Sequence, residues 1–373
     1  MYSSHTVPLN QHPDGGWTHQ VQADKAYQDS VLPGVSRTFA LTIPQLPEYL
    51  RGTVTNAYLL CRIADTIEDH LPGDSVAKAE WFKRLDIALR GQEPAEPFGR
   101  ELARMFPRQS TPRTELELVR NTHRVLRVTR ALPAWQRRSV VRCVRVLAKG
   151  MARFQANKRP DGLADMAAFD DYCYHVAGVV GEMLTVLFCG YSTVMGRHRQ
   201  ELMRMSLSFG QALQMTNILK DVWNDRERGV CWLPRDIFAG AGCPLDADAD
   251  WAGDPHFHEG MRRMVAIARG HLDRGFEYVL QIPVSEPGIR RFCIWALGMA
   301  ALTLGNIHRH PQFRDPAEIK ISRRTVRGLM TITPALVRRD WLLKASYAAA
   351  TRRLPPADVR PAHNPAHGGP AGR

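Results

Sequence analysis

Two short acidic segments carry the side chains of this sequence that are best suited to chemistry. In the first, Asp65 and Asp69 are four residues apart, so both carboxylates project from one face of a helix, with Glu68 beside them. The second repeats this spacing at Asp221 and Asp225. Carboxylates at this spacing repel each other unless a cation lies between them. Ligand sets made only of oxygen suit Mg²⁺, with Mn²⁺ as the alternative.

Further polar residues extend both acidic segments. Asn217 stands one turn before Asp221 on the same helix face, and the basic residues Arg62, Lys220 and Arg228 flank the two segments. A single acidic pair is explained as well by a surface patch paired to Arg62. Two such helices facing each other across a cavity, however, predict metal-assisted departure of diphosphate from an allylic substrate.

The elements that must position these groups are helices. Apolar residues recur mostly at helical spacing, alternating strand patterns are nearly absent, and prolines stand at plausible helix boundaries. We predict an all-α fold with on the order of a dozen helices. The length of 373 residues, without an internal repeat or a linker, favours one catalytic domain over residues 31–350. Residues 1–30 are predicted to form a mobile arm, and residues 351–373 a basic, Pro-rich disordered tail.

The charge balance favours an anionic partner. There are 50 Lys and Arg against 37 Asp and Glu, a formal net charge of +13, which suits a phosphorylated substrate, a lipid surface or a nucleic acid. One basic helix face, Arg138, Arg142, Arg145 and Lys149, is typical of a solvated surface. Nucleic-acid binding requires interleaved aromatic residues or a known motif, and neither is found, so we expect no nucleic-acid partner.

Cysteine usage and the N-terminal segment indicate a cytoplasmic protein. The seven cysteines are scattered and never spaced as CxxC, which predicts a reducing compartment without disulfides or zinc. The first 30 residues contain no apolar run typical of a signal peptide. The longest stretch without Lys, Arg or Asp runs from Tyr172 to Gly196, but Glu182 interrupts it, so we interpret it as a buried core helix rather than a membrane span.

Six segments, in the expected order within residues 31–340, resemble the signature segments of the squalene/phytoene synthase family, and most closely those of bacterial-type squalene synthases. They are Ser36–Phe39, Asp65–Asp69, Gly150–Phe154, Tyr172–Gly181, Asn217–Asp225 and Gly229–Pro234. The resemblance implies the isoprenoid-synthase fold, a single antiparallel helical bundle around a central apolar channel. It also implies prenyltransferase activity, in which two prenyl diphosphates such as farnesyl diphosphate condense head to head.

The resemblance assigns roles to individual residues. The implied magnesium ligands are Asp65, Glu68, Asp69, Asn217, Asp221 and Asp225, and the implied catalytic residues are Tyr172 and the four aspartates. The implied diphosphate-binding residues are Ser36, Arg37, Phe39, Arg62, Gln214, Lys220 and Arg228. The phenol ring of Tyr172 could stabilise a carbocation, but a group with a pKa near 10 is a poor base, so the released diphosphate could take the proton.

The end product depends on a reductant. Hydride from NADPH would convert the cyclopropyl diphosphate intermediate to squalene, whereas loss of a proton gives phytoene or 4,4'-diapophytoene. No GxGxxG motif is present. A basic segment from Lys320 to Met330 and an aromatic one at Phe292 resemble the squalene-synthase cofactor region, which implies Asn217, Phe292, Lys320 and Arg323 as cofactor-binding residues. Ser322 departs from that pattern, since a basic residue is usual there.

Three functions follow in order of preference. The first is an NADPH-dependent squalene synthase, the second a phytoene or dehydrosqualene synthase, and the third a non-catalytic helical scaffold at a membrane surface. Because the product is insoluble in water, we expect peripheral attachment to the inner face of the membrane. The basic tail could contribute through Arg352, Arg353, Arg360 and Arg373, or it could be idle.

Overall fold

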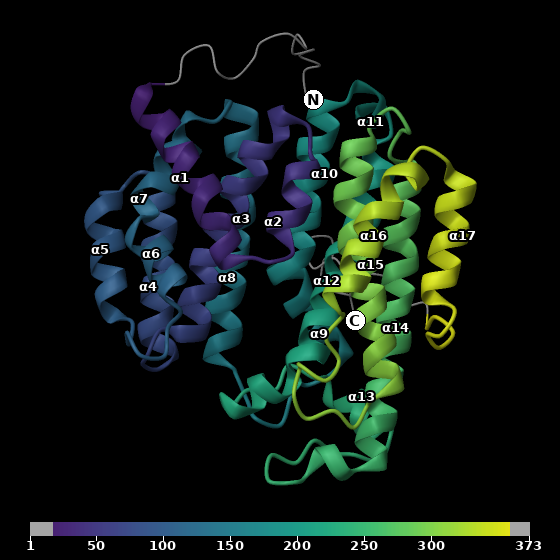
Figure 1. The fold of residues 1–373 in the computed structure, drawn as a ribbon. Coiled ribbons are helices and arrows are strands. Elements are labelled where there is room, and N and C mark those ends of the chain that lie inside the picture. The colour runs from purple at the N-terminus through teal and green to yellow at the C-terminus, as the bar shows by residue number, and fades with distance from the viewer. Residues whose placement is uncertain (1–17, 359–373) are drawn as a thin grey trace, which may run out of the picture. The chain divides into compact units, whose positions relative to one another are not determined.

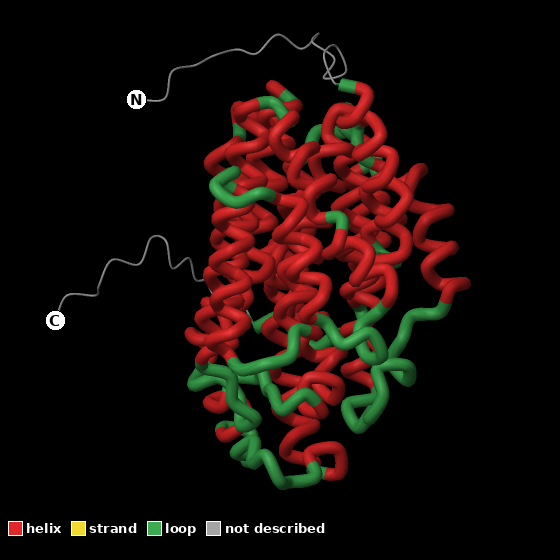
Figure 2. The backbone as a smooth tube through the Cα atoms, turned by 90° about the vertical axis from the view of Figure 1, so that its left-hand side faces the viewer, coloured by secondary structure: helices red, strands yellow, loops and turns green. Residues whose placement is uncertain are grey.

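The computed structural model describes residues 18–358, and these form helices joined by loops (Figures 1 and 2). Within this range there is no β-strand, and one isolated parallel bridge joins Leu163 to Pro234. The predicted all-α class is therefore confirmed. The chain divides into two compact units: unit 1 comprises residues 1–145 and 186–197, and unit 2 comprises residues 146–185 and 198–373.

Unit 1 contains these helices: α1 (His19–Val35), α2 (Phe39–Thr42), η1 (Ile43–Gln45), α3 (Glu48–His70), α4 (Ser75–Leu89), α5 (Ala95–Met105), α6 (Arg113–Arg120), α7 (Thr122–Ala131) and α11 (Thr193–Arg197). Helices α8 (Ala134–Ala156) and α10 (Val179–Tyr191) contribute residues to both units. Unit 2 contains α9 (Met166–Cys173), the π-helical segment η2 (Tyr174–Gly178), α12 (Arg199–Glu227), α13 (Arg235–Ala239), η3 (Trp251–Gly253), α14 (Pro255–Gln281), α15 (Pro287–Arg309), α16 (Arg323–Leu336) and α17 (Asp340–Thr351).

Helix α3 lies at the centre of unit 1 and carries the first acidic segment. It packs against α1, α4, α6 and α7. Leu59, Leu60, Ile63 and Ile67 are completely buried along one face, at the three- and four-residue spacing of an amphipathic helix. The acidic residues follow the other face of the same helix, so burial of the apolar face fixes the direction in which the carboxylates point.

Helix α1 corrects the prediction that residues 1–30 form a mobile arm. Residues 19–30 are helical and packed, because Asp24 is fully buried between the guanidinium groups of Arg124 and Arg127, at 2.8 and 2.7 Å. Buried Gln28 accepts a 2.9 Å hydrogen bond from Asn56. The buried side chains of this helix are partly polar, so no apolar period marks it in the sequence. The rest of the predicted arm, residues 1–17, lies outside the described part of the chain.

Helix α12 is the main element of unit 2 and carries the second acidic segment. It packs against α14, α15 and the π-helical segment η2. A Cβ atom added to Gly181 would lie 2.2 Å from the carbonyl oxygen of Ser206, and one added to Gly210 would lie 2.3 Å from that of Ala177. Backbones this close exclude any side chain at these two positions. The long connections of unit 2 gather at the end where α13 lies (Figures 1 and 2).

The end of the chain also packs more than predicted. Arg269 on α14 donates a 2.7 Å hydrogen bond to the carbonyl oxygen of Thr351, Leu354 is buried, and the amide of Asp358 donates to Ala266 at 3.0 Å. The first residues of the predicted disordered tail are thus attached to α14 through backbone groups, which composition does not reveal. Arg360 and Arg373 lie outside the described residues.

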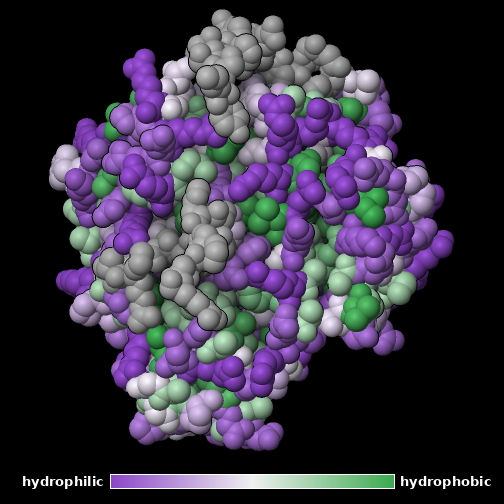
Figure 3. Space-filling view, turned by 180° about the vertical axis from the view of Figure 1, so that it is seen from behind, coloured by the Kyte–Doolittle hydropathy of each residue, from purple (hydrophilic) through white to green (hydrophobic). Residues whose placement is uncertain are grey.

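One helical run, Met166–Tyr191, is long and apolar enough to cross a bilayer by length and composition. Of its most apolar window, 67% is buried within the structure, as is usual for a core helix. Glu182 lies in this run and is itself buried. The face in Figure 3 is mostly hydrophilic, with apolar side chains scattered over it.

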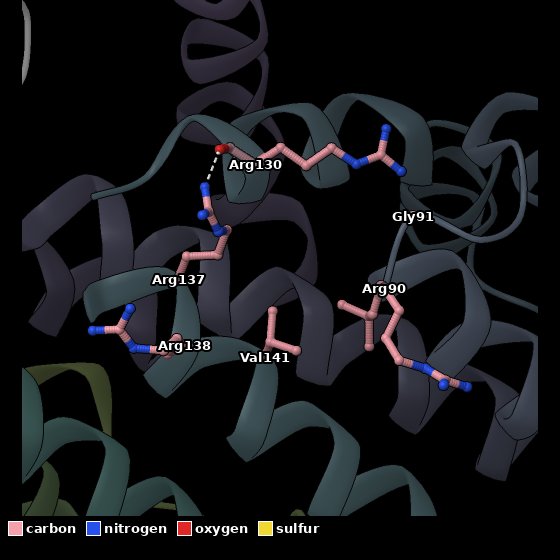
Figure 4. A pocket seen from close by; sticks show the side chains of 7 residues that line it. Arg90, Gly91, Arg130, Arg137, Arg138 and Val141 are labelled. Atoms are coloured by element: carbon pink, nitrogen blue, oxygen red, sulfur yellow. Dashed lines mark hydrogen bonds between the residues drawn. The ribbon is translucent and has the colours of Figure 1, made fainter. Parts of the chain in front are cut away.

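Unit 1 has a shallow hollow of about 540 Å³ on its surface, which we call the arginine hollow (Figure 4). Arg130 comes from α7, Arg137 and Arg138 come from the start of α8, and Arg90 follows α4. Arg137 donates a 2.8 Å hydrogen bond to the carbonyl oxygen of Arg130. The remaining lining residues are Leu89, Gly91 and Val141, so four positive charges and no acidic residue line the hollow.

Candidate active site

The first acidic segment lies on the last two turns of α3. Asp65 and Asp69 share one helix face, as predicted from their spacing, and Glu68 is adjacent. The side chain of Asp65 keeps 35% of its surface exposed, and protein atoms surround the rest of the side chain. This burial raises the pKa of Asp65 to about 7, and the charge of Asp69 adds to the rise while Arg62 opposes it. The positive charge of Arg62 alone therefore does not offset the cost of burying the ionised Asp65 carboxylate.

Arg62 is held in place by a buried acidic residue that the sequence analysis did not identify. Glu115 on α6 accepts a short hydrogen bond from Arg62, and it also lies 3.3 Å from the hydroxyl of Thr66 and 3.5 Å from His70. Arg62 lies 3.7 Å from Asp65 as well. The guanidinium group is thus oriented beside the acidic pair. Only the spatial packing of α6 on α3 reveals Glu115, because no sequence motif includes it.

Tyr58 connects the Ser36–Phe39 segment to α3. Its ring lies 4.9 Å from that of Phe39, and its hydroxyl donates a 3.2 Å hydrogen bond to the carbonyl oxygen of Val35. Ser36 accepts a 2.9 Å hydrogen bond from the amide of Phe39 and so caps the turn, while Arg37 is exposed. Burial raises the pKa of Tyr58 to about 12, so the phenol stays neutral. Tyr58 lies one helical turn before Arg62. This four-residue spacing is the sequence signal that could have pointed to Tyr58 as a neighbour of the acidic segment.

The second acidic segment lies near the end of α12. Asn217, Asp221 and Asp225 follow one another at four-residue intervals, and Gln214 lies half-buried one turn earlier. Asp221 keeps 34% of its side-chain surface exposed and lies 3.1 Å from the ammonium group of Lys220. Asp225 is largely buried and accepts a short hydrogen bond from Arg228. Each predicted basic neighbour therefore contacts an aspartate of its own segment.

Tyr172 lies in the last turn of α9, two residues before the π-helical segment η2 begins. Such π-helical turns are frequent at functional sites because they shift the register of the side chains that follow. The bulge brings His175 against α8, where a Cβ atom on Gly150 would lie 2.3 Å from that of His175. Asp171 accepts from Arg153 of α8 and lies 3.2 Å from His175. The Gly150–Phe154 motif is therefore the part of α8 on which the segment carrying Tyr172 packs.

The tyrosine ring itself is buried among aromatic rings. Trp232 stacks on Tyr172 with ring centroids 4.2 Å apart, and Phe154 contacts it edge-on at 5.1 Å. Only 4% of Tyr172 is exposed. Trp232 belongs to the Gly229–Pro234 segment, but its stacking on Tyr172 depends on the pairing of two loops, which no local sequence pattern predicts.

The predicted cofactor residues come from α12, from α15 and from the start of α16. Lys320 and Arg323 are exposed at the start of α16, and Ser322 caps that helix by accepting a 3.1 Å hydrogen bond from Thr325. A capping role explains why Ser322 departs from the basic pattern. Phe292 is buried near the start of α15, which packs against α16. Six residues further along α15, a Cβ atom on Gly298 would lie 3.1 Å from the side chain of Leu329, and Asn306 donates a 2.8 Å hydrogen bond to the carbonyl oxygen of Ile319.

Among residues 18–358 no three or more His, Cys, Asp or Glu side chains are grouped as a ready metal site. The α3 pair belongs to unit 1 and the α12 pair to unit 2. That the two pairs face each other across a cavity therefore stays a prediction.

Comparison with known proteins finds similar sequences over most of the chain. The family model for squalene/phytoene synthase matches residues 32–325. Squalene synthase ERG9 of Gibberella zeae is 27% identical over 279 residues, which cover 74% of this chain and 57% of that protein. The chain thus spans less than two thirds of that relative.

Two solved structures share the fold. The complex of TcSQS with the ligand BPH1237 superimposes with a TM-score of 0.71 at 23% identity, covering 89% of this chain and 91% of that one. A dehydrosqualene synthase in complex with a ligand matches with a TM-score of 0.56 at 20% identity, covering 85% and 97%. These similarities confirm the predicted isoprenoid-synthase fold. Since the family model also covers most of the sequence, this chain belongs to the squalene/phytoene synthase family.

Proposed function

We propose that the chain condenses two molecules of farnesyl diphosphate head to head, through presqualene diphosphate, and reduces the intermediate with NADPH to squalene. The observation that carries this proposal is the pair of aspartates presented by each of two helices. In each pair the first aspartate keeps about a third of its side-chain surface exposed, 35% for Asp65 and 34% for Asp221. Each is therefore open to a ligand and lies beside a basic group.

A divalent cation fits the donor set of these pairs. The residues are all oxygen ligands, and ionised Asp65 needs positive charge beyond that of Arg62, as its raised pKa shows. When bound, Mg²⁺ or Mn²⁺ would act as a Lewis acid that stabilises the charge on the departing diphosphate. The residues that we assign to hold it are Asp65, Glu68, Asp69, Asn217, Asp221 and Asp225.

Basic side chains would bind the diphosphate, and Tyr172 would act on the hydrocarbon. Arg62 and Arg228 are already oriented by Glu115 and Asp225, so little conformational freedom is lost when an anion arrives. We assign Ser36, Arg37, Phe39, Gln214 and Lys220 to the same task. The ring of Tyr172 presents a π face that can stabilise a carbocation in an enclosed, apolar environment.

We assign NADPH binding to Lys320 and Arg323, which are both exposed. The ammonium group of Lys320 and the paired N–H donors of the Arg323 guanidinium group can contact the phosphates of the cofactor. Phe292 and Asn217 remain in the assignment. The alternative, a phytoene or dehydrosqualene synthase, needs no reductant.

The test is a product analysis. Pure protein is incubated with farnesyl diphosphate and Mg²⁺, with and without NADPH, and the hydrocarbon extract is analysed. We expect squalene only in the presence of NADPH. A triene that forms regardless of NADPH would replace the proposal by the alternative. Absence of turnover in both reactions would reject both synthases and leave the non-catalytic scaffold.

We also propose that the protein attaches peripherally to the inner face of the cytoplasmic membrane. The net charge of +13 and the arginine hollow support binding to anionic lipid. We expect the protein to sediment with phosphatidylglycerol vesicles at low salt but not with zwitterionic vesicles. Each arginine near the surface contributes about 1 kcal/mol, so one lost charge weakens binding about fivefold.

Two variants locate the lipid contact. The double variant Arg137→Glu and Arg138→Glu reverses charge at the hollow, and a chain ending at Leu354 lacks residues 355–373 of the tail, among them Arg360 and Arg373. Loss of binding in the first variant alone assigns the contact to the hollow, and loss in the second alone assigns it to the tail. Equal binding of wild type to both kinds of vesicle would contradict the proposal.

A further inference from the structure

Trp232 and Phe154 enclose the ring of Tyr172 on two sides. The indole is parallel to the phenol ring, with 9° between the planes, and Phe154 meets it at 74°. Trp232 is 7% exposed and Tyr172 4%. The tyrosine ring cannot rotate about its side-chain bonds without losing the stacked contact, so these neighbours select one direction for its hydroxyl group.

The segment that carries the indole is fixed by backbone hydrogen bonds to the loop that follows α8. The amide of Cys231 donates to the carbonyl of Arg159 at 2.9 Å. Leu163 donates to Leu233 at 2.9 Å and accepts from Arg235 at 3.0 Å. This is the isolated parallel bridge of unit 2. Two loops, far apart in sequence, thus form a short backbone pairing around the indole.

A glycine permits this pairing. Gly162 has a φ of +95°, in the left-handed region that disfavours other residues, and a Cβ atom there would lie 2.5 Å from the carbonyl oxygen of Leu233. A side chain at this position would separate the two loops without touching either aromatic ring.

The same segment begins at the end of α12. The amides of Arg228 and Val230 donate to the carbonyl oxygen of Asp225 at 3.1 and 3.0 Å. Trp232 follows two residues later. The carboxylate-bearing end of α12 and the ring of Tyr172 are therefore joined by one short, hydrogen-bonded stretch of backbone.

We propose that Trp232 is a positioning residue for Tyr172, held by the pairing of residues 159–163 with residues 231–235. This inference rests on the proposed function, in which Tyr172 contacts the reacting hydrocarbon. Trp232 acts through the phenol ring and keeps it at one orientation relative to the end of α12. A small displacement of a reacting group costs on the order of a hundredfold in rate, so we expect a large effect on kcat and a small one on KM.

The test is a double-mutant cycle on formation of presqualene diphosphate, measured without NADPH. Trp232→Leu is expected to lower kcat about tenfold to a hundredfold, and Trp232→Phe, which keeps an aromatic face, is expected to retain most activity. Because Trp232 acts through the ring of Tyr172, adding Trp232→Leu to Tyr172→Leu, which removes that ring, should cause little further loss. Additive losses, or equal activity of the Leu and Phe variants at position 232, would overturn the proposal.

A matched control separates positioning from stability. Trp251 is also buried in unit 2, where its ring stacks on Phe257 at 5.4 Å and lies 3.8 Å from the guanidinium group of Arg226. Trp251→Leu is expected to lower thermal stability, and its effect on kcat should add to that of Tyr172→Leu. Gly162→Ala should reproduce the kinetic effect of Trp232→Leu, since it separates the loops.

A spectroscopic measurement tests positioning even if the enzyme does not turn over. In protein labelled with 3-fluorotyrosine, the fluorine resonance of Tyr172 is assigned by its loss in Tyr172→Phe. We expect Trp232→Leu to shift this resonance and Trp251→Leu to leave it in place. An unchanged resonance in Trp232→Leu would overturn the proposal. A wild-type protein without presqualene diphosphate formation would instead contradict the proposed function.

Discussion

Replacing Asp65 by asparagine is expected to slow diphosphate release from farnesyl diphosphate by about a thousandfold, which corresponds to about 4 kcal/mol of transition-state stabilisation. The substitution removes a negatively charged oxygen ligand and almost no volume. Asp221→Asn should have an equally large effect, because Asp221 occupies the corresponding place on α12, with similar exposure. Release of pyrophosphate measured with a coupled assay gives the rate.

The control for this prediction is an aspartate of the same unit outside the acidic segments. Asp86 on α4 lies 2.9 Å from Arg90 and also pairs with Arg145. Asp86→Asn should retain wild-type turnover. Thermal unfolding of all three variants should show folded proteins, since surface ion pairs contribute at most about 1 kcal/mol. Wild-type rates in Asp65→Asn or Asp221→Asn would refute the assignment of these residues as metal ligands.

Replacing Gly181 by alanine is expected to destabilise the protein by about 3 kcal/mol. The added methyl group would lie 2.2 Å from the carbonyl oxygen of Ser206, and neither helix backbone can move away without disturbing a packed core. Gly210→Ala should act in the same way, since its methyl group would lie 2.3 Å from the carbonyl oxygen of Ala177. Urea unfolding monitored by circular dichroism measures the change.

Gly305 provides the matched control, because it is also a helical glycine of unit 2 but has no atom within 4 Å of an added Cβ. Gly305→Ala should stabilise the protein by about 0.5–1 kcal/mol through the higher helix propensity of alanine. Equal free energies of unfolding for the Gly181→Ala and Gly305→Ala variants would contradict the close contact between the backbones of α10 and α12.

The helix-bound part of the site could be predicted from the sequence. The four-residue spacing of Asp65 and Asp69, and of Asp221 and Asp225, depends only on helix geometry, and both pairs lie on helices as expected. Helix boundaries were also readable where proline stands at a first turn, as Pro255 does in α14. These features are local, so an amphipathic pattern is sufficient to find them.

Contacts between distant segments could not be predicted. Helix α1 was missed because buried Asp24 depends on arginines a hundred residues away. Glu115 and the stacking of Trp232 on Tyr172 depend on tertiary pairing for the same reason. Family resemblance identified the segment that contains Trp232, but only the spatial arrangement shows what the side chain contacts.

We propose that one metal-bound diphosphate contacts the acidic pairs of both α3 and α12. A crystal structure of the protein with Mg²⁺ and an unreactive thiodiphosphate analogue of farnesyl diphosphate tests it most directly. We predict that Asp65 and Asp221 each coordinate a metal ion that also contacts the diphosphate of a single analogue molecule. A structure in which either aspartate lies on a surface away from that diphosphate would contradict the claim.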